Sequence, residues 1–262
     1  MRIYLINLDR APERLQYMQK AFDEAGLEFT RIPAVDGKQL SDQEISRVVS
    51  GESYLGWLTH GEVACFLSHR LCWEAIANGD DEYGAVFEDD ALLGGCAKEL
   101  LLDSAWIPRD ADIVKIDTAR SRIFVDKAGK TVGDRFSVRR LRSAHVAGGA
   151  YIISRNSARR FLARSQTFSE AVDDFLYSSQ TIVLGGVRIY QLDPALSIQR
   201  FFIGGERANE FPTSIEGREG KTRKRLGIIE RAKLVAFKES HTAFNKLLCL
   251  LGKRERIVVE FK

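Results

Sequence analysis

Three consecutive carboxylates, Glu88, Asp89 and Asp90, directly follow the apolar segment 85–87. Such a segment is typical of a buried strand, so the acids stand at a strand end, where they repel one another and lose hydration. Side chains alternate along an extended chain, which puts Glu88 and Asp90 on one face and Asp89 on the other. Two carboxylates on one face predict a site for Mg²⁺ or Mn²⁺, with water and the phosphates of a nucleotide-diphosphate substrate as the other ligands. An acidic, solvated turn is the alternative interpretation.

Length and composition fit one large α/β domain or two small ones, because the chain has 262 residues, of which 45% are apolar and 29% charged. The four cysteines form no CxxC pair and lack zinc-ligand spacing, so the sequence supports neither a disulfide framework nor a structural zinc. The first apolar stretch is too short for a signal peptide, and no apolar run reaches transmembrane length. Residence in the cytoplasm is therefore the expectation.

Basic residues gather near the end of the sequence. The segment from Arg218 to Lys262 holds 13 of the 39 lysines and arginines but only 5 of the 36 acidic residues. Within it, residues 226–251 interleave apolar and basic side chains as in an amphipathic helix. Such a helix can lie on an anionic membrane surface, or it can pack its apolar stripe on the body of the protein. Nucleic-acid binding is not expected, because no recognisable nucleic-acid module accompanies these residues.

Hydrophobic periodicity predicts strands that alternate with helices. Strands are predicted at residues 3–8, 29–35, 85–87, 113–116, 150–154 and 187–192, and helices at residues 12–25, 59–77, 171–184 and 226–251. The alternation favours an α/β fold with a mostly parallel, Rossmann-type sheet flanked by helices. Such sheets bind ligands at the carboxyl ends of their strands, where the three acids stand. We divide the chain into a domain over residues 1–204 and a basic amphipathic C-terminal extension over residues 205–262.

Four stretches carry a family resemblance through their residues, their order and their spacing. They are Ile6-Asn7-Leu8-Asp9-Arg10 with Pro12-Glu13-Arg14, then Ala34-Val35-Asp36-Gly37, then residues 58–69 (LTHGEVACFLSH), then Phe87-Glu88-Asp89-Asp90. Together they resemble glycosyltransferase family 25, which includes bacterial lipopolysaccharide and lipooligosaccharide galactosyltransferases and relatives that glycosylate collagen. A looser match runs through residues 149–154 to about Gln199, and the tail from about residue 205 lies outside it.

The resemblance implies a GT-A fold, a UDP-sugar donor and a divalent metal, Mn²⁺ in the first place and Mg²⁺ in the second. In the family's pattern Asp90 binds the metal directly, Glu88 reaches the metal or the ribose, and Asp89 acts through hydrogen bonds to neighbouring groups. The chemistry is consistent, because a metal on the donor phosphates neutralises the charge that develops as the sugar–oxygen bond breaks.

Further donor contacts are expected from the same resemblance. Asn7 and Leu8 would frame the uridine, and the planar guanidinium groups of Arg10 and Arg14 suit the diphosphate. Asp36 would bind the base or the ribose. Two of these residues have a structural alternative, Arg14 as an exposed helix residue and Asp36 as a turn former.

Ser68 and His69 lie on a helix that is expected to be buried. A lone histidine in such a place is ordinarily a satisfied core group, whereas the resemblance places His69 at the donor site. Both interpretations stay open for these two residues at this point.

Inverting transfer needs a base that accepts the proton of the acceptor hydroxyl. Asp174, or alternatively Asp173, matches an acidic position in the family's later half, while acids that stabilise a helix start are the structural alternative. Gln199, His241 and a water molecule are the candidates for a third metal ligand. His145 lies near a position where the family often has a histidine, but it is out of register.

The leading hypothesis is a metal-dependent inverting glycosyltransferase that moves a hexose, galactose in the first place, from UDP to a lipopolysaccharide, lipooligosaccharide or other surface glycan. The basic tail would bring it to the cytoplasmic face of the inner membrane, where glycolipid acceptors are made. A catalytically silent sugar-nucleotide- or glycan-binding module is one alternative, and the intact carboxylates argue against it. A nucleotidyltransferase is another, and the lack of a Gly-rich phosphate loop after the first strand argues against that.

Overall fold

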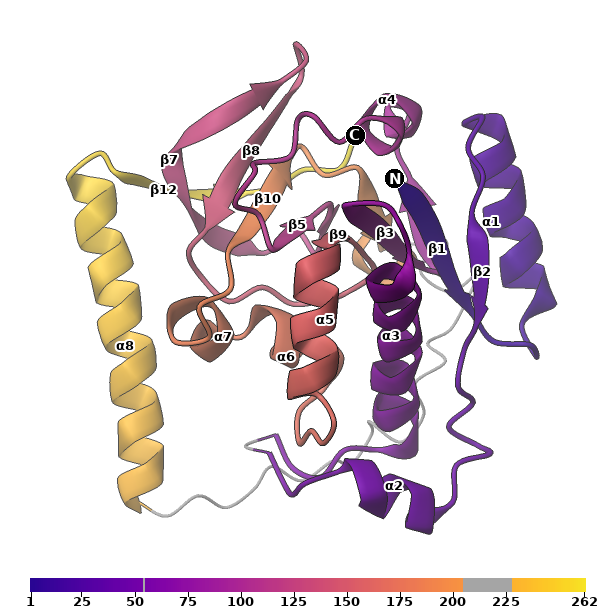
Figure 1. Ribbon diagram of the computed structural model, residues 1–262. Helices are drawn as coiled ribbons and strands as arrows, with labels where there is room; N and C mark the ends of the chain where they lie inside the picture. Colours follow the sequence, from indigo (N-terminus) through magenta and orange to yellow (C-terminus); the bar gives the residue numbers. More distant parts are fainter. Residues whose placement is uncertain (54, 205–227) are drawn as a thin grey trace.

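The computed structural model describes residues 1–53, 55–204 and 228–262, and its centre is a large β-sheet (Figure 1). The strands of that sheet are β1 Arg2–Asn7, β2 Thr30–Pro33, β3 Tyr83–Glu88, β5 Ile113–Lys115, β7 Arg122–Val132, β8 Phe136–Leu141, β9 Ala150–Ser154, β10 Ile189–Asp193 and β12 Arg254–Val258. They lie in the order β12-β7-β8-β10-β5-β9-β3-β1-β2. A second, smaller sheet contains β4 Ala91–Leu93, β11 Ser197–Gln199 and β6 Asp117–Thr118, with β11 in the middle.

Helices cover both faces of the large sheet. They are α1 Pro12–Glu24, α2 Asp42–Val48, α3 His60–Asn78, α4 Ala97–Leu102, α5 Arg155–Arg164, α6 Val172–Tyr177, α7 Ser179–Val183 and α8 Ile228–Leu250. One buried apolar cluster includes Trp73 of α3, Phe161 of α5 and Leu176 of α6. The other includes Phe22 of α1 and Leu101 of α4. The expected α/β class, with helices on a central sheet, is therefore confirmed.

The large sheet is mixed, which differs from the mostly parallel sheet that the strand–helix alternation indicated. β1 runs parallel to both β2 and β3, and β10 runs parallel to β5. β9 is antiparallel to its neighbours β3 and β5, and the pairs β7–β8, β8–β10 and β7–β12 are also antiparallel. A fully buried strand has the same apolar pattern in either direction, so the sequence did not distinguish the two arrangements.

Local sequence signals position the elements around the acids. α1 begins with Pro12 in its first turn, where a missing N–H costs nothing. α3 begins at a capping box in which Thr59 and Glu62 each accept a backbone N–H of the other. β3 is buried from Tyr83 to Phe87, and Glu88 is its last residue. The carboxyl ends of β1 and β3 therefore lie side by side with the acids at the edge.

Two segments differ from the predicted elements. Residues 171–184 form two helices, because the side chain of Ser178 accepts the N–H of Thr181 and so starts α7 where α6 ends. The sequence analysis did not predict α2, which begins at a capping box of Ser41 and Glu44. Neither difference moves the strand ends at which the acids lie.

The described part of the tail contains α8 and then β12, which pairs with β7 at the edge of the large sheet (Figure 1). Beyond β12, the N–H of Ala195 donates to the carbonyl of Glu260 at 2.7 Å and the N–H of Lys262 donates to the carbonyl of Ala195 at 3.2 Å. The division at residue 204 stays a prediction, although β12 joins the tail to the body. Within the described residues, every helix is too short or too polar to cross a bilayer.

Candidate active site

Glu88 and Asp90 meet at the side chain of Gln199. Gln199 Nε2 lies 2.7 Å from Glu88 Oε2 and 3.2 Å from each carboxylate oxygen of Asp90. The small sheet makes this contact, because β11 pairs with β4 so that Gln199 is opposite Ala91, the residue after Asp90. The predicted alternation is confirmed, with Glu88 and Asp90 on one side and Asp89 on another. Gln199 is thus the candidate third ligand that the fold places at the acids.

Asp89 is held by two side chains from the β1–α1 region. Arg14 Nη1 donates to Asp89 Oδ1 at 2.8 Å, and Asn7 Nδ2 donates to Asp89 Oδ2 at 2.8 Å. The side chain of Arg14 is 8% exposed, so its interpretation as an exposed helix residue is wrong. Burial raises the pKa of Asp89, and both partners oppose that shift by stabilising the carboxylate. This buried arrangement fixes the end of β3 relative to α1.

The surroundings of Asp90 disfavour its charged form. Burial, followed by the neighbouring carboxylate of Glu88, raises the pKa of Asp90 to about 7. The amide of Gln199 donates into the space between the two carboxylates, which is where a positive charge would relieve their repulsion most. Oxygen ligands of this kind suit Mg²⁺ and Mn²⁺, so these residues fit the metal that the sequence predicts.

His69 contacts Glu88 from the opposite side to Gln199. His69 Nε2 lies 3.0 Å from Glu88 Oε1, and His69 Nδ1 lies 3.0 Å from the hydroxyl oxygen of Tyr151. The indole N–H of Trp73 donates to the same hydroxyl oxygen at 2.7 Å. In the neutral ring, Nε2 therefore carries the proton toward Glu88 while Nδ1 accepts the O–H of Tyr151. His69 is a fully buried group with a partner at each ring nitrogen, as the core interpretation expects, and one of these partners is Glu88. Its place in the donor site stays a prediction.

A loop from β8 to β9 covers the same region. The N–H of Glu88 donates to the carbonyl of Gly149 at 2.8 Å. A Cβ on Gly149 would lie 2.4 Å from Gln199 Cγ, so a glycine is required for this close approach. Beneath the loop, the buried Lys115 Nζ lies 2.5 Å from the carbonyl oxygen of Ala147 and 2.5 Å from Asp117 Oδ1. We infer that this buried ion pair holds the loop against the site.

The remaining predicted donor residues surround the end of β1. Arg10 Nε donates to Asp36 Oδ2 at 2.8 Å. Burial would raise the pKa of Asp36, but the hydrogen bonds from Arg10 and from the backbone of Lys38 lower it below its usual range. Leu8 belongs to the turn into α1, where its carbonyl accepts the N–H of Ala11. Their contacts with a donor stay predictions.

Ser68 connects the end of β2 to α3. Its Oγ donates to the carbonyl of Ala64 at 2.7 Å and accepts the N–H of Val35 at 2.9 Å. Because both partners are backbone groups, Ser68 fixes the segment that leads to Asp36. Its predicted place in the donor site stays a prediction.

Two further predictions concern residues of the later half. Asp173 and Asp174 lie in the first turn of α6, a helix that packs against α3. Their role as a base is untested by this geometry. His241 lies on α8, where its Nε2 is 3.3 Å from Asn245 Nδ2, and Asn245 in turn donates to the carbonyl of Arg142. The structure thus places Gln199 at the acids and His241 on α8, the helix that packs beside the edge strand β12 (Figure 1).

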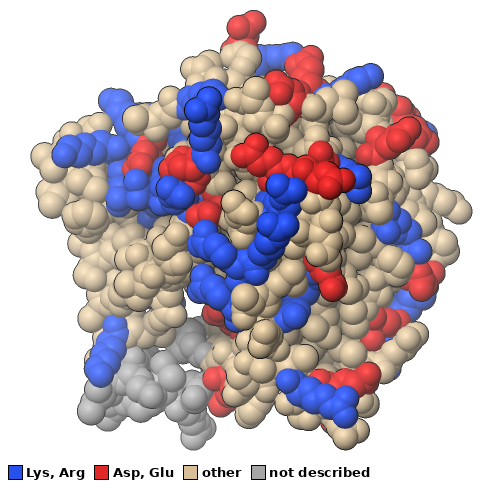
Figure 2. All heavy atoms as spheres, in the orientation of Figure 1, with Lys and Arg blue, Asp and Glu red and all other residues tan. Residues whose placement is uncertain are grey.

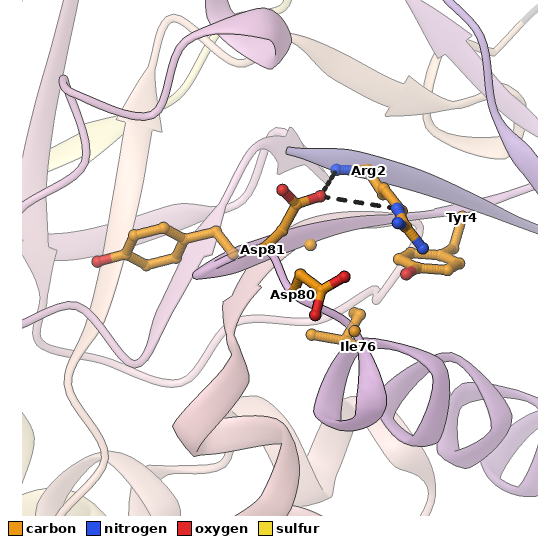
Figure 3. Close-up of a pocket in the computed structure, with 8 residues that line it drawn as sticks. Arg2, Tyr4, Ile76, Asp80 and Asp81 are labelled. Atoms are coloured by element: carbon orange, nitrogen blue, oxygen red, sulfur yellow. Dashed lines mark hydrogen bonds and ion pairs between the residues drawn. The ribbon is translucent and has the colours of Figure 1, made fainter.

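A shallow pocket lies at the opposite ends of β1 and β3 (Figure 3). It is lined by Arg2, Tyr4, Ile76, Asp80 and Asp81, among others. The backbone N–H of Arg2 donates to Asp81 Oδ2 at 2.9 Å, and the two side chains form an exposed ion pair. The pocket is therefore far along the strands from Glu88 and is braced by its own polar groups.

Two groups of residues that shape the site were not predicted from the sequence. Nothing in the sequence joins Trp73 to Tyr151, because only the pairing of β3 with β9 brings Tyr151 to α3. Lys115 and Asp117 follow an apolar strand at alternate positions, as Glu88 and Asp90 do. That repeated spacing could have indicated that Lys115 and Asp117 also lie at the strand ends near the site.

Comparisons with known proteins show the family of the chain. A family model described as "Glycosyltransferase family 25 (LPS biosynthesis protein)" matches residues 1–176. Lacto-N-neotetraose biosynthesis glycosyltransferase LgtE of Neisseria gonorrhoeae is 31% identical over 210 residues, covering 76% of this chain and 74% of the relative. Lipooligosaccharide biosynthesis protein lic2B of Haemophilus influenzae is 25% identical over 265 residues, covering 97% of this chain and 92% of the relative.

Among solved structures, a glycosyltransferase involved in the glycosylation of the major capsid of PBCV-1 has a TM-score of 0.45 at 11% identity and covers 80% of this chain and 96% of that chain. The family model spans more than half of the sequence and includes the strand ends that carry Asn7, Glu88 and Asp90. The chain therefore belongs to glycosyltransferase family 25, and it is a glycosyltransferase.

Proposed function

We propose that this protein is a metal-dependent inverting hexosyltransferase of lipooligosaccharide or lipopolysaccharide biosynthesis. Its donor is a UDP-sugar, UDP-galactose in the first place, and its acceptor is a glycolipid or oligosaccharide. The observation that supports this best is the convergence of Glu88 and Asp90 on Gln199 at the carboxyl end of β3. The relatives named for lacto-N-neotetraose and lipooligosaccharide biosynthesis support the choice of acceptor.

Asp90 and Glu88 would hold Mn²⁺ or Mg²⁺. Gln199 would add its amide oxygen after its side-chain amide turns over, because Nε2 faces the carboxylates in the structure. When bound, the ion offsets the negative charge that develops on the departing diphosphate. The protein prepares this site before any ligand binds, because Asp89 is locked by Arg14 and Glu88 is oriented by His69. Preorganisation of this kind lowers the cost of binding and positions the donor.

The donor would extend from the metal site toward the end of β1. Asn7 is buried, and its amide already joins Asp89 to the β1–α1 turn, so Asn7 and Leu8 would form one wall of the uridine site. Arg10 and Asp36 form a partly exposed pair beside it and would contact the diphosphate and the ribose or base. Arg14 is buried against Asp89, so its guanidinium would act on the diphosphate mainly through that carboxylate.

Acceptor activation requires a base on the face of the sugar opposite the diphosphate. We assign it to Asp174, with Asp173 as the alternative. The base takes the proton of the acceptor hydroxyl while that oxygen bonds to the anomeric carbon, and the bond from that carbon to UDP breaks on the other face. Attack from the opposite face inverts the anomeric configuration.

The outward side of α8 supports peripheral contact with the cytoplasmic face of the inner membrane. Its exposed large apolar residues include Val235, Phe244, Leu247 and Leu250, and Leu251 follows directly after the helix. The exposed lysines nearby include Lys233, Lys246 and Lys253. Figure 2 shows that the left edge of the molecule, where Figure 1 places α8, is largely uncharged with basic side chains near its two ends. Apolar side chains flanked by lysines match a surface of anionic lipids.

Calorimetry with UDP, UDP-galactose, UDP-glucose and UDP-N-acetylglucosamine, each with and without Mn²⁺, tests the donor site. We expect metal-dependent binding in the wild type and its loss in Asp90→Ala. Asp80→Ala is the matched control, because Asp80 is an exposed acid at the other end of the sheet. No UDP binding in any condition would overturn the proposal. Hydrolysis or transfer of the bound sugar separates an enzyme from a silent binding module.

A further inference from the structure

Three different ligand types converge beside the proposed metal site. Cys65 and His69 are four residues apart on α3, so they lie on one face of the helix. Glu88 approaches both, with Oε1 at 3.8 Å from Cys65 Sγ and 3.0 Å from His69 Nε2. The ligand atoms of all three residues lie within 4.8 Å of one another.

We propose that Cys65, His69 and Glu88 bind Zn²⁺ at a site distinct from the one formed by Glu88, Asp90 and Gln199. A thiolate, an imidazole and a carboxylate are the three ligand types that Zn²⁺ takes in proteins, whereas Mg²⁺ and Mn²⁺ prefer oxygen alone. Tetrahedral zinc with ordinary bond lengths separates its ligand atoms by about 3.3–3.6 Å. The two distances from Glu88 Oε1 lie close to that range on either side. Sub-ångström side-chain shifts would bring them into it.

The surroundings of His69 support the assignment. The hydroxyl of Tyr151 holds Nδ1 and so directs Nε2 toward Glu88 and Cys65. A hydroxyl both donates and accepts, so Tyr151 can accept the Nδ1 proton once Nε2 binds a metal. Metal-bound histidines are commonly oriented through their other nitrogen in this way. Cys65 and Glu88 are partly exposed, which gives an ion and a fourth, solvent ligand access to the site.

The spacing of the cysteines in the sequence does not predict this site, because only one of its three ligands is a cysteine. Cys65 and His69 come from α3, and Glu88 comes from the end of β3. Its consequence for activity rests on the proposed function. Zn²⁺ would draw Glu88 away from Asp90 and Gln199, so we expect Zn²⁺ to inhibit transfer and to compete with Mn²⁺. The enzyme would then lose activity at Zn²⁺ concentrations that leave the fold intact.

Co²⁺ is the probe for the first test, because a thiolate bound to Co²⁺ gives a charge-transfer absorption band in the near ultraviolet. We expect this band in the full-length wild type, its loss on adding Zn²⁺, and its absence in Cys65→Ser. Zinc affinity by calorimetry should fall at least tenfold in Cys65→Ser. Cys249→Ser is the matched control, since Cys249 is a partly exposed cysteine on α8 and should keep both signals.

Circular dichroism of Cys65→Ser and of Cys65→Ala establishes that a lost band does not reflect unfolding. A wild type without the band, or a folded Cys65→Ser that keeps it, would overturn the proposal. Asp90→Ala separates this inference from the proposed function, because it removes a ligand of one site only. Zinc binding that persists in Asp90→Ala without UDP binding supports both sites. Metal-dependent UDP binding in a wild type without the cobalt band would reject the zinc site alone.

Discussion

Tyr151 holds His69 from the side opposite Glu88, with 3.0 Å between its hydroxyl oxygen and His69 Nδ1. Tyr151→Phe removes that hydroxyl and also leaves the indole N–H of Trp73 without its acceptor. We expect a loss of about 1–3 kcal/mol in the free energy of unfolding, because both groups are buried. Mn²⁺-dependent UDP affinity should fall about tenfold, because Glu88 loses its orientation. Urea unfolding and calorimetry measure the two effects.

Tyr190→Phe is the control for that variant. The Tyr190 hydroxyl donates to Asp110 in an exposed pair on the large sheet, so its loss should change neither quantity appreciably. A Tyr151→Phe protein with wild-type UDP affinity would show that the hydroxyl of Tyr151 is not needed to keep His69 and Glu88 in place.

Asp174→Asn should abolish sugar transfer while UDP binding stays at the wild-type level. The substitution keeps the size of the side chain and removes its ability to take a proton. Transfer is measured with a glycolipid or oligosaccharide acceptor, and UDP binding by calorimetry on the same protein. If Asp174→Asn remains active and Asp173→Asn is inactive, the base is Asp173.

His145 makes the stability of the protein depend on pH. Its buried Nδ1 lies 2.7 Å from the carbonyl of Val146, so Nδ1 carries the proton of the neutral ring. Burial and then the charge of Lys115 lower the pKa of His145 to about 3. The unfolded chain takes up this proton near pH 6.5 and the folded chain does not, so folding is favoured above pH 6.5 and loses that stability as the pH falls toward 3.

From pH 6.5 to pH 5 the wild type should lose about 2 kcal/mol relative to His145→Asn, which keeps a donor near the Val146 carbonyl. Urea unfolding at several pH values measures the difference between the two proteins. Parallel pH profiles would show that His145 is not the group responsible.

The pair of Lys115 and Asp117 is fully buried, with exposed side-chain fractions of 0% and 1%. Lys115→Met leaves Asp117 charged and unpaired, which should cost about 3–5 kcal/mol in the free energy of unfolding. The double variant Lys115→Met/Asp117→Asn removes both charges and should recover much of that loss. Denaturant unfolding of the wild type, of Lys115→Met, of Asp117→Asn and of the double variant gives the coupling energy. Equal losses in Lys115→Met and in the double variant would contradict this expectation.

Vesicle binding should depend on the outward side of α8. Leu250 and Leu247 are 86% and 52% exposed, and Leu247→Glu/Leu250→Glu should weaken binding to phosphatidylglycerol vesicles at least tenfold at low salt. Leu184→Glu is the control, since Leu184 is 72% exposed but lies outside α8. Sedimentation with vesicles measures the bound fraction. Unchanged binding of the α8 variant would leave the helix a structural role only.

Local patterns predicted the parts of the site that depend on neighbouring residues. The predicted alternation places Glu88 and Asp90 together correctly, although β3 ends at Glu88 and both aspartates lie in the turn that follows. The capping box of Thr59 followed from four residues. Contacts between segments that are far apart in the sequence were harder to predict. Asp89 follows Arg14 by 75 residues, so the sequence did not show that Arg14 was buried.

The candidates for a third metal ligand illustrate the same limit. The sequence left Gln199, His241 and a water molecule open, because it does not show which group reaches the acids. The register of β11 on β4 brings Gln199 to Asp90 across 109 residues, whereas His241 lies on α8. Strand register depends on pairing across the whole fold, so the sequence of β4 or of β11 alone does not predict it.

The separation of Gln199 from the carboxylates along the sequence bears on how the site is made. Ala195 lies just before β11, so two backbone hydrogen bonds with residues 260–262 support a segment that β4 and β6 already hold by strand pairing. Glu88 and Asp90 are synthesised first, and Gln199 follows Asp90 by 109 residues. The nascent chain therefore carries the two carboxylates without their amide partner until the ribosome has added that length of chain.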